Sequence, residues 1–260
     1  MPNPHLWGDD PVSELVIAGV VVLLAAVFNA RRLGWRLKGG GLLLRAASKF
    51  VLGLLLAGGL VFGTAGTFCF PNGWLFMGVV FIPILLVGAV TARAAPDLLE
   101  KRLKAKEPRK EQNLVVKLSG LMFLVGFVLA GLNFRLGWHV LPRWVSYMAA
   151  GVFLAAYLLY AEVLRENRYL SRTVEVQEGQ TVVSTGLYGM VRHPMYAATV
   201  LLFWSMPLIL GSVYAFLVFL PYPLLLAKRI RQEEELLERE LAGYKEYKQK
   251  VKYRLIPFVW

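Results

Sequence analysis

Long apolar segments recur along the chain, and their lengths restrict the folds that it can adopt. Each approaches the roughly 20 residues that a helix needs to cross the hydrocarbon core of a bilayer. Helices are expected because backbone polar groups must pair within the segment when lipid surrounds it. The segments are Ser13–Ala30, Phe50–Phe70, Gly73–Ala92, Leu118–Phe134, Trp144–Ala161, Pro194–Leu210 and Ser212–Ala227. The sequence therefore predicts an all-α polytopic membrane protein with about seven transmembrane helices.

Composition supports this prediction and leaves no block long enough for a separate soluble domain. Hydrophobic residues make up 57% of the chain and charged residues 18%, whereas a soluble domain carries about 25% charged residues. The formal net charge of +12 would suggest a nucleic-acid partner in a soluble protein. Here the basic residues lie between apolar segments, so we expect the anionic lipid surface of the membrane as partner, and no nucleic acid.

Cysteine and histidine usage excludes two classes of site. The single cysteine, Cys69, cannot form an intrachain disulfide, and its place at the end of an apolar segment favours a small buried hydrophobic residue. The histidines, His5, His139 and His193, are too scattered to form a zinc-type ligand set with one cysteine. We therefore expect no metal site.

The distribution of positive charge predicts the orientation of the helices. The first segment is interpreted as a membrane helix, because acidic Asp9, Asp10 and Glu14 stand where a cleavable signal peptide would be positive. With the N-terminus outside, the inner loops and the C-terminal tail hold 27 of the 29 Lys and Arg residues. The positive-inside rule then favours seven crossings and a cytoplasmic C-terminus. Five crossings fit equally well if one adjacent pair of segments does not span.

The last two apolar segments are short and nearly fused. Gly211-Ser212 is the obvious turn between them, and Pro207, Pro221 and Pro223 are expected to kink or shorten their helices. Such a pair predicts a tight hairpin that need not cross at full depth, as broken helices do where they line a cavity.

Two polar stretches are predicted to lie outside the membrane. The first, Arg165–Val191, contains two short extended pieces, Thr173–Val176 and Thr181–Val183, around Glu178-Gly179. The second begins at Lys228 and is predicted to be one charged, amphipathic cytosolic helix that continues to about Lys250.

Two polar clusters flank the predicted hairpin. The first, Gly186–Tyr196, brings Arg192 and His193 to a membrane boundary, where an interfacial belt is the ordinary explanation. The second pairs Arg229 with Glu233, and a solvated ion pair four residues apart is again the ordinary explanation. Because the hairpin returns both clusters to one membrane face, they also predict a pocket for a ligand with polar and lipid-like ends.

These clusters carry a resemblance to the isoprenylcysteine carboxyl methyltransferase family. The family's first motif is H-x-L-V-x-x-G-x-Y followed by R-H-P-x-Y, and the second is R-x-x-x-E-E followed by L, Y-x-x-Y and I-P. The first is similar to residues 180–196 of this chain. The second is matched by Arg229, Glu233, Glu234, Leu237, Tyr244, Tyr247, Ile256 and Pro257. The resemblance covers about Arg165–Trp260.

The resemblance implies a membrane methyltransferase that uses S-adenosylmethionine and acts on a lipid-like or prenylated acceptor. It implies that Arg229 faces the acceptor and orients its carboxylate. The implied cofactor-binding residues are Gln180, Val182, Val183, Tyr188, His193, Pro194, Met195, Tyr196, Glu233 and Glu234. The chain departs from the family at Gln180, where a histidine is usual, and a shortened spacing before Tyr244 leaves the choice between Glu233 and Glu234 open.

Two other functions compete with this one. Membrane sterol and enone reductases, which use NADPH, are similar in the C-terminal region, but His193-Pro194 and Glu233-Glu234 favour methyl transfer. A transporter or scaffold would be expected to carry ionisable residues at mid-membrane depth, and the apolar segments are almost free of them. We expect one continuous membrane domain, with three helices and basic loops in residues 1–112 and the methyltransferase core in residues 113–260.

Overall fold

The computed structural model describes residues 40–103, 110–138, 140–170 and 176–260, and this part of the chain is helical with no β-strand. Its elements are α2 (Gly40–Ala65), α3 (Pro71–Ala94), α4 (Pro96–Leu103), α5 (Lys110–Arg135), α6 (Arg143–Glu166), the 3₁₀ turn η2 (Gly186–Gly189), α7 (Pro194–Ile209), α8 (Val213–Phe219), α9 (Tyr222–Glu240) and α10 (Tyr244–Lys250). The predicted helix Ser13–Ala30 lies outside the described residues.

Within the described residues, five stretches are long and apolar enough to cross a membrane, which confirms an all-α integral membrane protein. They are Gly41–Ala65, Pro71–Ala94, Leu114–Arg135, Arg143–Glu166 and Val213–Glu240. The apolar helix α7 is shorter, with 16 residues. Each predicted segment within the described residues coincides with a helix or with the α8–α9 pair. The helix α2 begins ten residues before the predicted Phe50, because Arg45 and Lys49 are good helix formers that extend it past the apolar limit.

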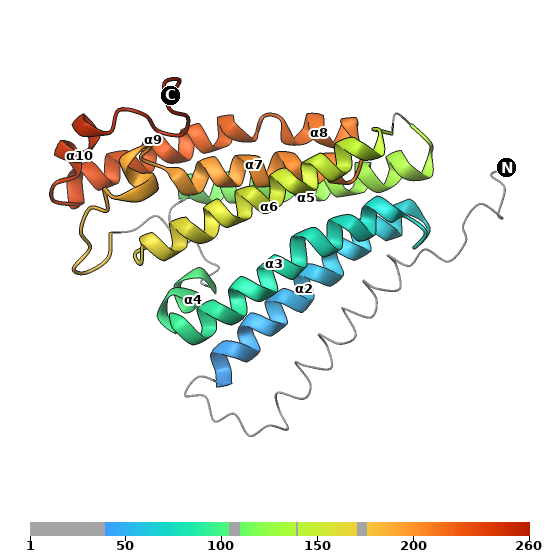
Figure 1. The fold of residues 1–260 in the computed structure, drawn as a ribbon, viewed down its shortest axis with the longest axis horizontal. Coiled ribbons are helices and arrows are strands. Elements are labelled where there is room, and N and C mark those ends of the chain that lie inside the picture. Colours follow the sequence, from blue (N-terminus) through green and yellow to red (C-terminus); the bar gives the residue numbers. More distant parts are fainter. Residues whose placement is uncertain (1–39, 104–109, 139, 171–175) are drawn as a thin grey trace.

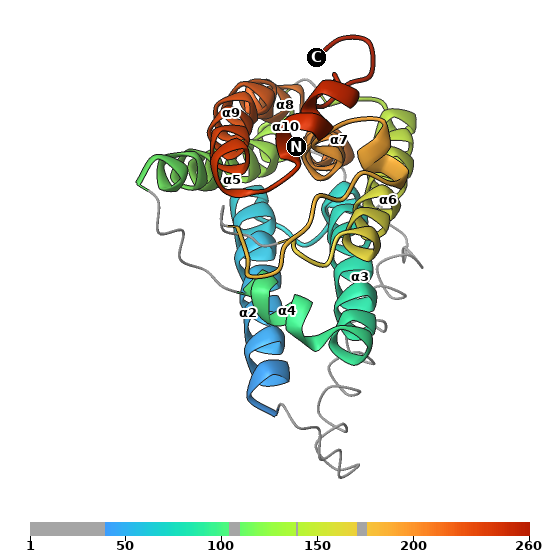
Figure 2. The same ribbon diagram turned by 90° about the vertical axis from the view of Figure 1, so that its left-hand side faces the viewer.

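In Figure 1, α7, α8 and α9 lie along the longest axis of the molecule, and α2 and α3 are inclined to it. Figure 2 shows α5 to α9 grouped on one side and the pair α2 and α3 on the other. The two groups join where α2 packs on α5 and α3 packs on α6. Aromatic rings fill the core, with Phe123, Phe127 and Phe219 in mutual edge or tilted contact. The described helices therefore pack against one another across both groups.

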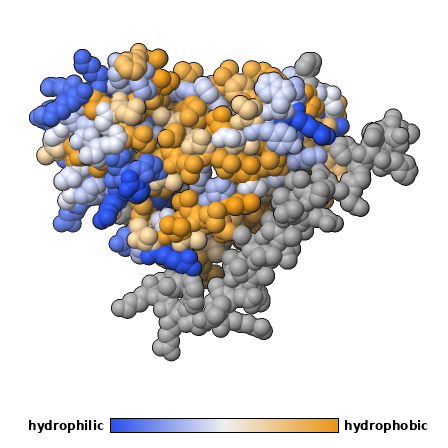
Figure 3. Space-filling model, in the orientation of Figure 1, coloured by the Kyte–Doolittle hydropathy of each residue, from blue (hydrophilic) through white to orange (hydrophobic). Residues whose placement is uncertain are grey.

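Apolar and hydrophilic residues separate along the molecule. Figure 3 shows apolar residues across its middle and hydrophilic residues gathered at the end that holds α4 and α10. Cys69 was wrongly predicted to be buried: it is exposed in the turn between α2 and α3, where its backbone amide donates to Thr67 Oγ1 at 3.0 Å. In this turn the neighbouring Phe70 is buried in the core instead.

The predicted hairpin is confirmed, with the turn at Gly211-Ser212 and a break between α8 and α9 at Pro221. Ser212 Oγ caps α8 by accepting from the amide of Ala215 at 3.2 Å. Pro207 lies inside the last turn of α7, which ends two residues later. The antiparallel return brings the start of α7 beside α9.

The single charged helix predicted from Lys228 to Lys250 is wrong. The chain leaves the helix after Glu240 and restarts as α10 at Tyr244. Gly243 adopts a φ of 81°, a left-handed conformation that glycine takes without strain, so the chain can reverse here. The predicted extended pieces form no strand in the described residues. Val176 and Thr181–Val183 are irregular and flank a turn at Glu178-Gly179, while 173–175 lie outside the described residues.

Candidate functional site

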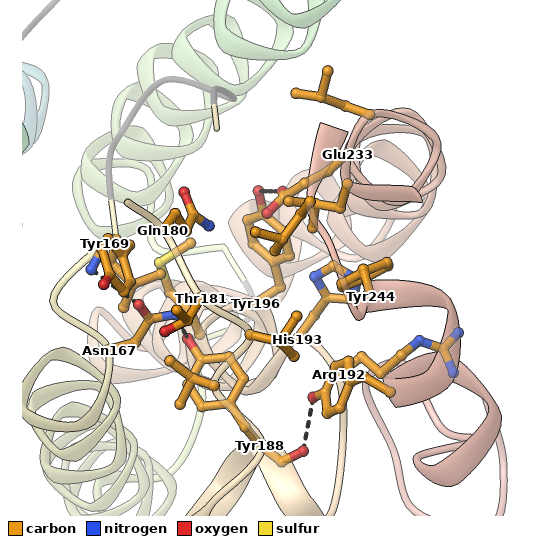
Figure 4. Close-up of a pocket in the computed structure, with 18 of the residues that line it drawn as sticks. Asn167, Tyr169, Gln180, Thr181, Tyr188, Arg192, His193, Tyr196, Glu233 and Tyr244 are labelled. Atoms are coloured by element: carbon orange, nitrogen blue, oxygen red, sulfur yellow. Dashed lines mark hydrogen bonds between the residues drawn. The ribbon is translucent and has the colours of Figure 1, made fainter. Parts of the chain in front are cut away.

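A pocket lies at the hydrophilic end of the bundle, where α6 ends, α7 begins and α9 passes. Its cavity measures about 100 Å³ and is open to solvent. In Figure 4, Asn167, Gln180 and Thr181 form one wall, and Tyr196, Glu233 and Tyr244 form the other. The lining residues are Asn167, Tyr169, Leu170, Gln180, Thr181, Val182, Val183, Tyr188, Arg192, His193, Met195, Tyr196, Arg229, Glu233, Leu236, Leu237, Leu241, Tyr244 and Tyr247.

A pocket-facing cluster joins α7 to α9. Tyr196 donates its hydroxyl hydrogen to Glu233 Oε2 at 2.6 Å and accepts from Arg229 Nε at 2.9 Å (Figure 4). Arg229 and Glu233 are four residues apart, so they share one face of α9, as predicted. The phenol of Tyr196 is the bridge between them, and it separates the cation from the carboxylate. The pocket-facing cluster therefore presents an anion and a cation at different points of one wall.

A buried cluster lies behind this wall. Glu234 is 2% exposed, and its Oε1 accepts from Arg192 Nε at 2.7 Å and lies 3.2 Å from His193 Nε2. Its Oε2 accepts from Arg254 Nε at 2.9 Å. A buried carboxylate with this many partners is stabilised only while they remain in place. Glu234 therefore fixes the position of residues that line the pocket.

The C-terminal segment is tied to the same cluster. Arg192 Nη1 donates to the carbonyl oxygens of Val251 at 2.6 Å and Lys252 at 2.8 Å. The backbone amides of Arg192 and His193 donate to Tyr253 and Arg254, each at 2.9 Å. These bonds hold the residues after α10 against the start of α7, so the pocket wall depends on contacts far apart in sequence.

The 3₁₀ turn η2 delivers Tyr188 to the pocket floor. Gly186 has a φ of 48°, and a Cβ atom there would lie 2.3 Å from Glu166 Oε1, so glycine is required. Glu166, at the end of α6, accepts from Thr185 Oγ1 at 2.8 Å and from the amide of Leu187 at 3.3 Å. These two bonds anchor the turn to α6.

The tyrosines of the floor are held as neutral phenols. Asn167 Nδ2 donates to the Tyr188 hydroxyl at 3.0 Å, and Tyr247 donates to the Tyr188 carbonyl oxygen at 2.7 Å (Figure 4). Burial raises the pKa of Tyr188 and of Tyr247 well above the ordinary value for a phenol. Both side chains therefore act as hydrogen-bonding groups at physiological pH.

Tyr244 is a buried polar group that lacks a partner. It is 4% exposed, and within the described part of the chain its hydroxyl makes no hydrogen bond. Burial raises the pKa of this phenol as well, so it keeps its proton. Because an unsatisfied buried hydroxyl costs about 1–3 kcal/mol, its position in the pocket wall indicates that a ligand completes the bond.

Most of the residues predicted from the sequence line this pocket together. They are Gln180, Val182, Val183, Tyr188, His193, Met195, Tyr196, Arg229 and Glu233. Two predicted residues are not among the lining residues: Pro194 is buried in the first turn of α7, and Glu234 belongs to the buried cluster.

Sequence reasoning missed part of the lining. The lining residues that were not predicted are Asn167, Tyr169, Leu170, Thr181, Arg192, Leu236, Leu237, Leu241, Tyr244 and Tyr247. A signal existed for Asn167, which follows α6 directly, and for Tyr244 and Tyr247, which belong to the second motif. No group of three or more His, Cys, Asp or Glu residues suited to a metal occurs in the described residues.

Comparisons with known proteins agree with the geometry. Residues 147–239 match the profile of the isoprenylcysteine carboxyl methyltransferase (ICMT) family. A solved structure of the eukaryotic intramembrane Ras methyltransferase ICMT aligns over 96% of this chain and 97% of its own, with a TM-score of 0.51 and 18% sequence identity. This likeness shows that the two share a fold.

A curated relative is similar over a shorter stretch. A Delta(14)-sterol reductase from Mus musculus is 33% identical over 91 residues, which is 34% of this chain. The chain spans only about a fifth of the length of that reductase, since the match covers 22% of it. The similarity therefore covers only part of either chain.

Proposed function

We propose that the chain is a member of the isoprenylcysteine carboxyl methyltransferase family, whose profile matches residues 147–239, and that it transfers the methyl group of S-adenosylmethionine to a lipid-like or prenylcysteine-type acceptor. The observation that carries the proposal is the pocket itself. It joins the two sequence motifs, which lie about 40 residues apart along the chain, on one wall through the Tyr196 bridge between Arg229 and Glu233.

The donor set of the pocket suits the cofactor. S-adenosylmethionine has an ammonium, ribose hydroxyls and an adenine, and these require acceptors and donors at separate points. Glu233 supplies a carboxylate, Tyr244 supplies a hydroxyl that lacks a partner in the described residues, and the backbone of Val182 and Val183 supplies polar edges.

We propose Glu233, Tyr244, Gln180, Val182, Val183, Tyr188, His193, Met195 and Tyr196 as cofactor-binding residues. Glu233 is chosen over Glu234 because it lines the pocket, whereas both oxygens of Glu234 have partners in the buried cluster. Glu234 and Pro194 then support the wall from behind.

The residues of the chain would position the acceptor. Bound S-adenosylmethionine supplies an electrophilic methyl group on a sulfonium, which becomes a neutral thioether when an acceptor oxygen takes the methyl group. Arg229 lies on the same wall as Glu233 and orients an acceptor carboxylate by charge-assisted hydrogen bonds. A carboxylate is already an anion, so no general base is needed. Holding the oxygen close to the methyl carbon is then the main contribution of the protein.

The apolar helices give a lipid-like acceptor its route to the pocket. We propose that the hydrophilic end faces the cytoplasm, with the N-terminus outside, because almost all Lys and Arg residues then lie inside. In this arrangement residues 113–260 form the catalytic core, and the described helices of residues 1–112, which are α2, α3 and α4, lie beside it. The orientation is testable by accessibility labelling of single cysteines introduced at Lys245 and Trp138.

A nicotinamide-dependent reductase is the second candidate because of the sterol reductase match, but this match covers only 34% of the chain and does not favour it over methyl transfer. Calorimetry on the purified protein in detergent separates the two. We expect S-adenosylmethionine to bind and NADPH not to bind, and we expect methyl transfer from labelled cofactor to a farnesylated cysteine carboxylate. Binding of NADPH by a folded sample that ignores S-adenosylmethionine would reverse the assignment.

A further inference from the structure

The loop formed by residues 255–260, called the 255–260 loop below, exposes a group of apolar side chains. Ile256 is 55% exposed, Val259 75% and Phe258 87%. Phe258 also has a φ of 66°, and it is the only non-glycine residue with a positive φ in the part of the chain that the structure describes. A bulky side chain rarely adopts this conformation. An exposed apolar group of this kind commonly marks a surface that contacts a partner or a membrane.

The 255–260 loop is closed by its own backbone. The amides of Arg254, Leu255 and Ile256 donate to the backbone oxygen of Trp260 at 2.9, 2.9 and 3.1 Å. The amide of Trp260 donates back to the carbonyl oxygen of Ile256 at 3.1 Å. The exposure of the apolar side chains therefore belongs to a defined conformation of the loop.

The 255–260 loop is attached to the core of the bundle. Leu255 is buried in the main hydrophobic core together with Ile230 of α9, and Trp260 packs against the same core. In contrast, Tyr244 and Tyr247 of α10 belong to a separate, smaller hydrophobic cluster. The loop is therefore anchored beside the membrane-spanning helices and not on the α10 cluster.

The helix α6 indicates the level of the loop along the bilayer normal. Its 24 residues span about 36 Å, a little more than the hydrocarbon core of roughly 30 Å. Trp144 and Tyr147 are exposed at its first residues, as is typical of one membrane interface, so its other end reaches the opposite interface. There Glu166 accepts from the turn η2 before α7, and the amide of His193 at the start of α7 donates to the carbonyl oxygen of Arg254 at 2.9 Å. The 255–260 loop therefore lies at the interface on the pocket side.

The surroundings of the loop suit lipid. Figure 2 shows the end of the chain on the side of the molecule away from α2 and α3, and Figure 1 shows it beside α9. The apolar stretch that includes α8 and α9 exposes Leu217, Leu220 and Leu224, which are expected to face lipid in a membrane-spanning segment. Lys250 and Lys252 precede the loop and are exposed, so they can reach anionic headgroups. Apolar side chains beside basic ones are typical of contacts with the membrane interface.

We propose that the 255–260 loop is an interfacial anchor, which inserts its three exposed apolar side chains into the lipid surface on the pocket side of the membrane. The anchor also bears on the pocket. Arg254 Cζ lies 5.3 Å from the centre of the Trp260 ring, and Arg254 Nε donates to Glu234 Oε2 at 2.9 Å. The anchor therefore holds the buried cluster at the membrane surface. The inference goes beyond the proposed function, because it requires neither a methyl donor nor an acceptor.

The test measures the depth of one position in the loop. In a Cys69→Ser background, which removes the single cysteine, Phe258→Cys is labelled with a nitrobenzoxadiazole fluorophore. The protein is reconstituted into vesicles of phosphatidylcholine and phosphatidylglycerol. We expect emission to shift to shorter wavelength, lipids with a spin label near the headgroup to quench it, and aqueous iodide to lose its quenching. The matched control is Lys245→Cys, exposed on α10 outside the loop, which iodide should quench and the spin-labelled lipid should not.

Equal quenching by iodide at the two positions overturns the inference. Protection from iodide without quenching by the spin-labelled lipid also overturns it, because another copy of the protein would then cover the loop. If Phe258→Cys unfolds at a lower temperature than wild type in detergent, Val259→Cys provides the same measurement one position along the loop. Absence of methyl transfer would refute the proposed function but would leave the measured depth of the loop unchanged.

Discussion

The pocket-facing cluster and the buried cluster lie on two sides of the same turn of α7, and they use adjacent glutamates of α9 in different ways. Glu233 contacts Tyr196 and borders open space, whereas Glu234 contacts Arg192, His193 and Arg254 and is almost fully buried. Neighbouring positions on a helix point about 100° apart, so one face can serve a ligand while the next supports the wall. We therefore expect Glu233 to govern the affinity for the ligand and Glu234 to govern the stability of the protein.

Removing the charge of the buried cluster should have the largest effect. Glu234→Gln leaves the Arg192 guanidinium buried without its anion, and breaking a buried pair in this way destabilises a protein by about 3–5 kcal/mol. We expect a large drop in thermal unfolding temperature and loss of cofactor binding at the same time, measured by thermal melts and calorimetry in one detergent. A stable Glu234→Gln variant would show that the buried cluster is not structural.

Removing the charge of the pocket-facing cluster should affect the ligand instead. Glu233→Gln keeps the shape of the side chain but loses the anion, so the affinity for S-adenosylmethionine should fall about 10- to 100-fold. The unfolding temperature should stay near that of wild type, because the carboxylate borders the open cavity. Calorimetry beside a thermal melt checks both values, and an equal loss of stability in the two glutamate variants would end the distinction between the clusters.

The next prediction concerns the Tyr196 hydroxyl, which bridges Arg229 and Glu233. Tyr196→Phe removes the hydroxyl that accepts from Arg229 and donates to Glu233. With the spacer gone, the cation and the carboxylate can pair directly, so we expect the KM of the acceptor and the Kd of the cofactor each to rise about tenfold. Steady-state kinetics with both substrates varied gives the two values, and Tyr169→Phe, on the opposite wall, is the control.

The sequence predicted the helices and most of the pocket, but it left the roles of the two glutamates open. Apolar runs determine helices because their length must match the bilayer, and the motif spacing places Arg229 and Glu233 on one face. Which glutamate borders the cavity depends on how α9 is rotated against α7, and this is set by packing between distant residues. The tail residue Arg254, which binds Glu234, lies 20 positions away and belongs to an irregular segment.

Tyr244 belongs to the second motif, but its place in the pocket wall depends on a helix break that was not predicted. If the helix from Lys228 had continued to Lys250, Tyr244 would lie about 16 Å along the axis from Glu233 and outside the pocket. The break at Gly243 turns the chain back and brings the side chain into the wall. Arg102 belongs to a basic stretch that was interpreted as a topology signal, and only the packing of α4 reveals its contacts with α6 and α7.

The smallest expected effect concerns the buried hydroxyl of Tyr244. Tyr244→Phe removes a group that lacks a partner within the described residues, so the free protein should be as stable as wild type or slightly more stable. The affinity for S-adenosylmethionine should fall about five- to tenfold, because the ligand loses one hydrogen bond.

Burial raises the pKa of the Tyr244 phenol above its ordinary value of 10.0, so both the folded and the unfolded chain keep the proton below pH 9. The difference in affinity between wild type and Tyr244→Phe should therefore be constant from pH 6 to about 9, as measured by calorimetry, whereas any stability that the protonated phenol contributes is lost only as the pH rises above 10. An unchanged affinity in this variant would mean that the hydroxyl does not contact the cofactor, and the cofactor side of the pocket would then have to be assigned to Glu233 and the opposite wall alone.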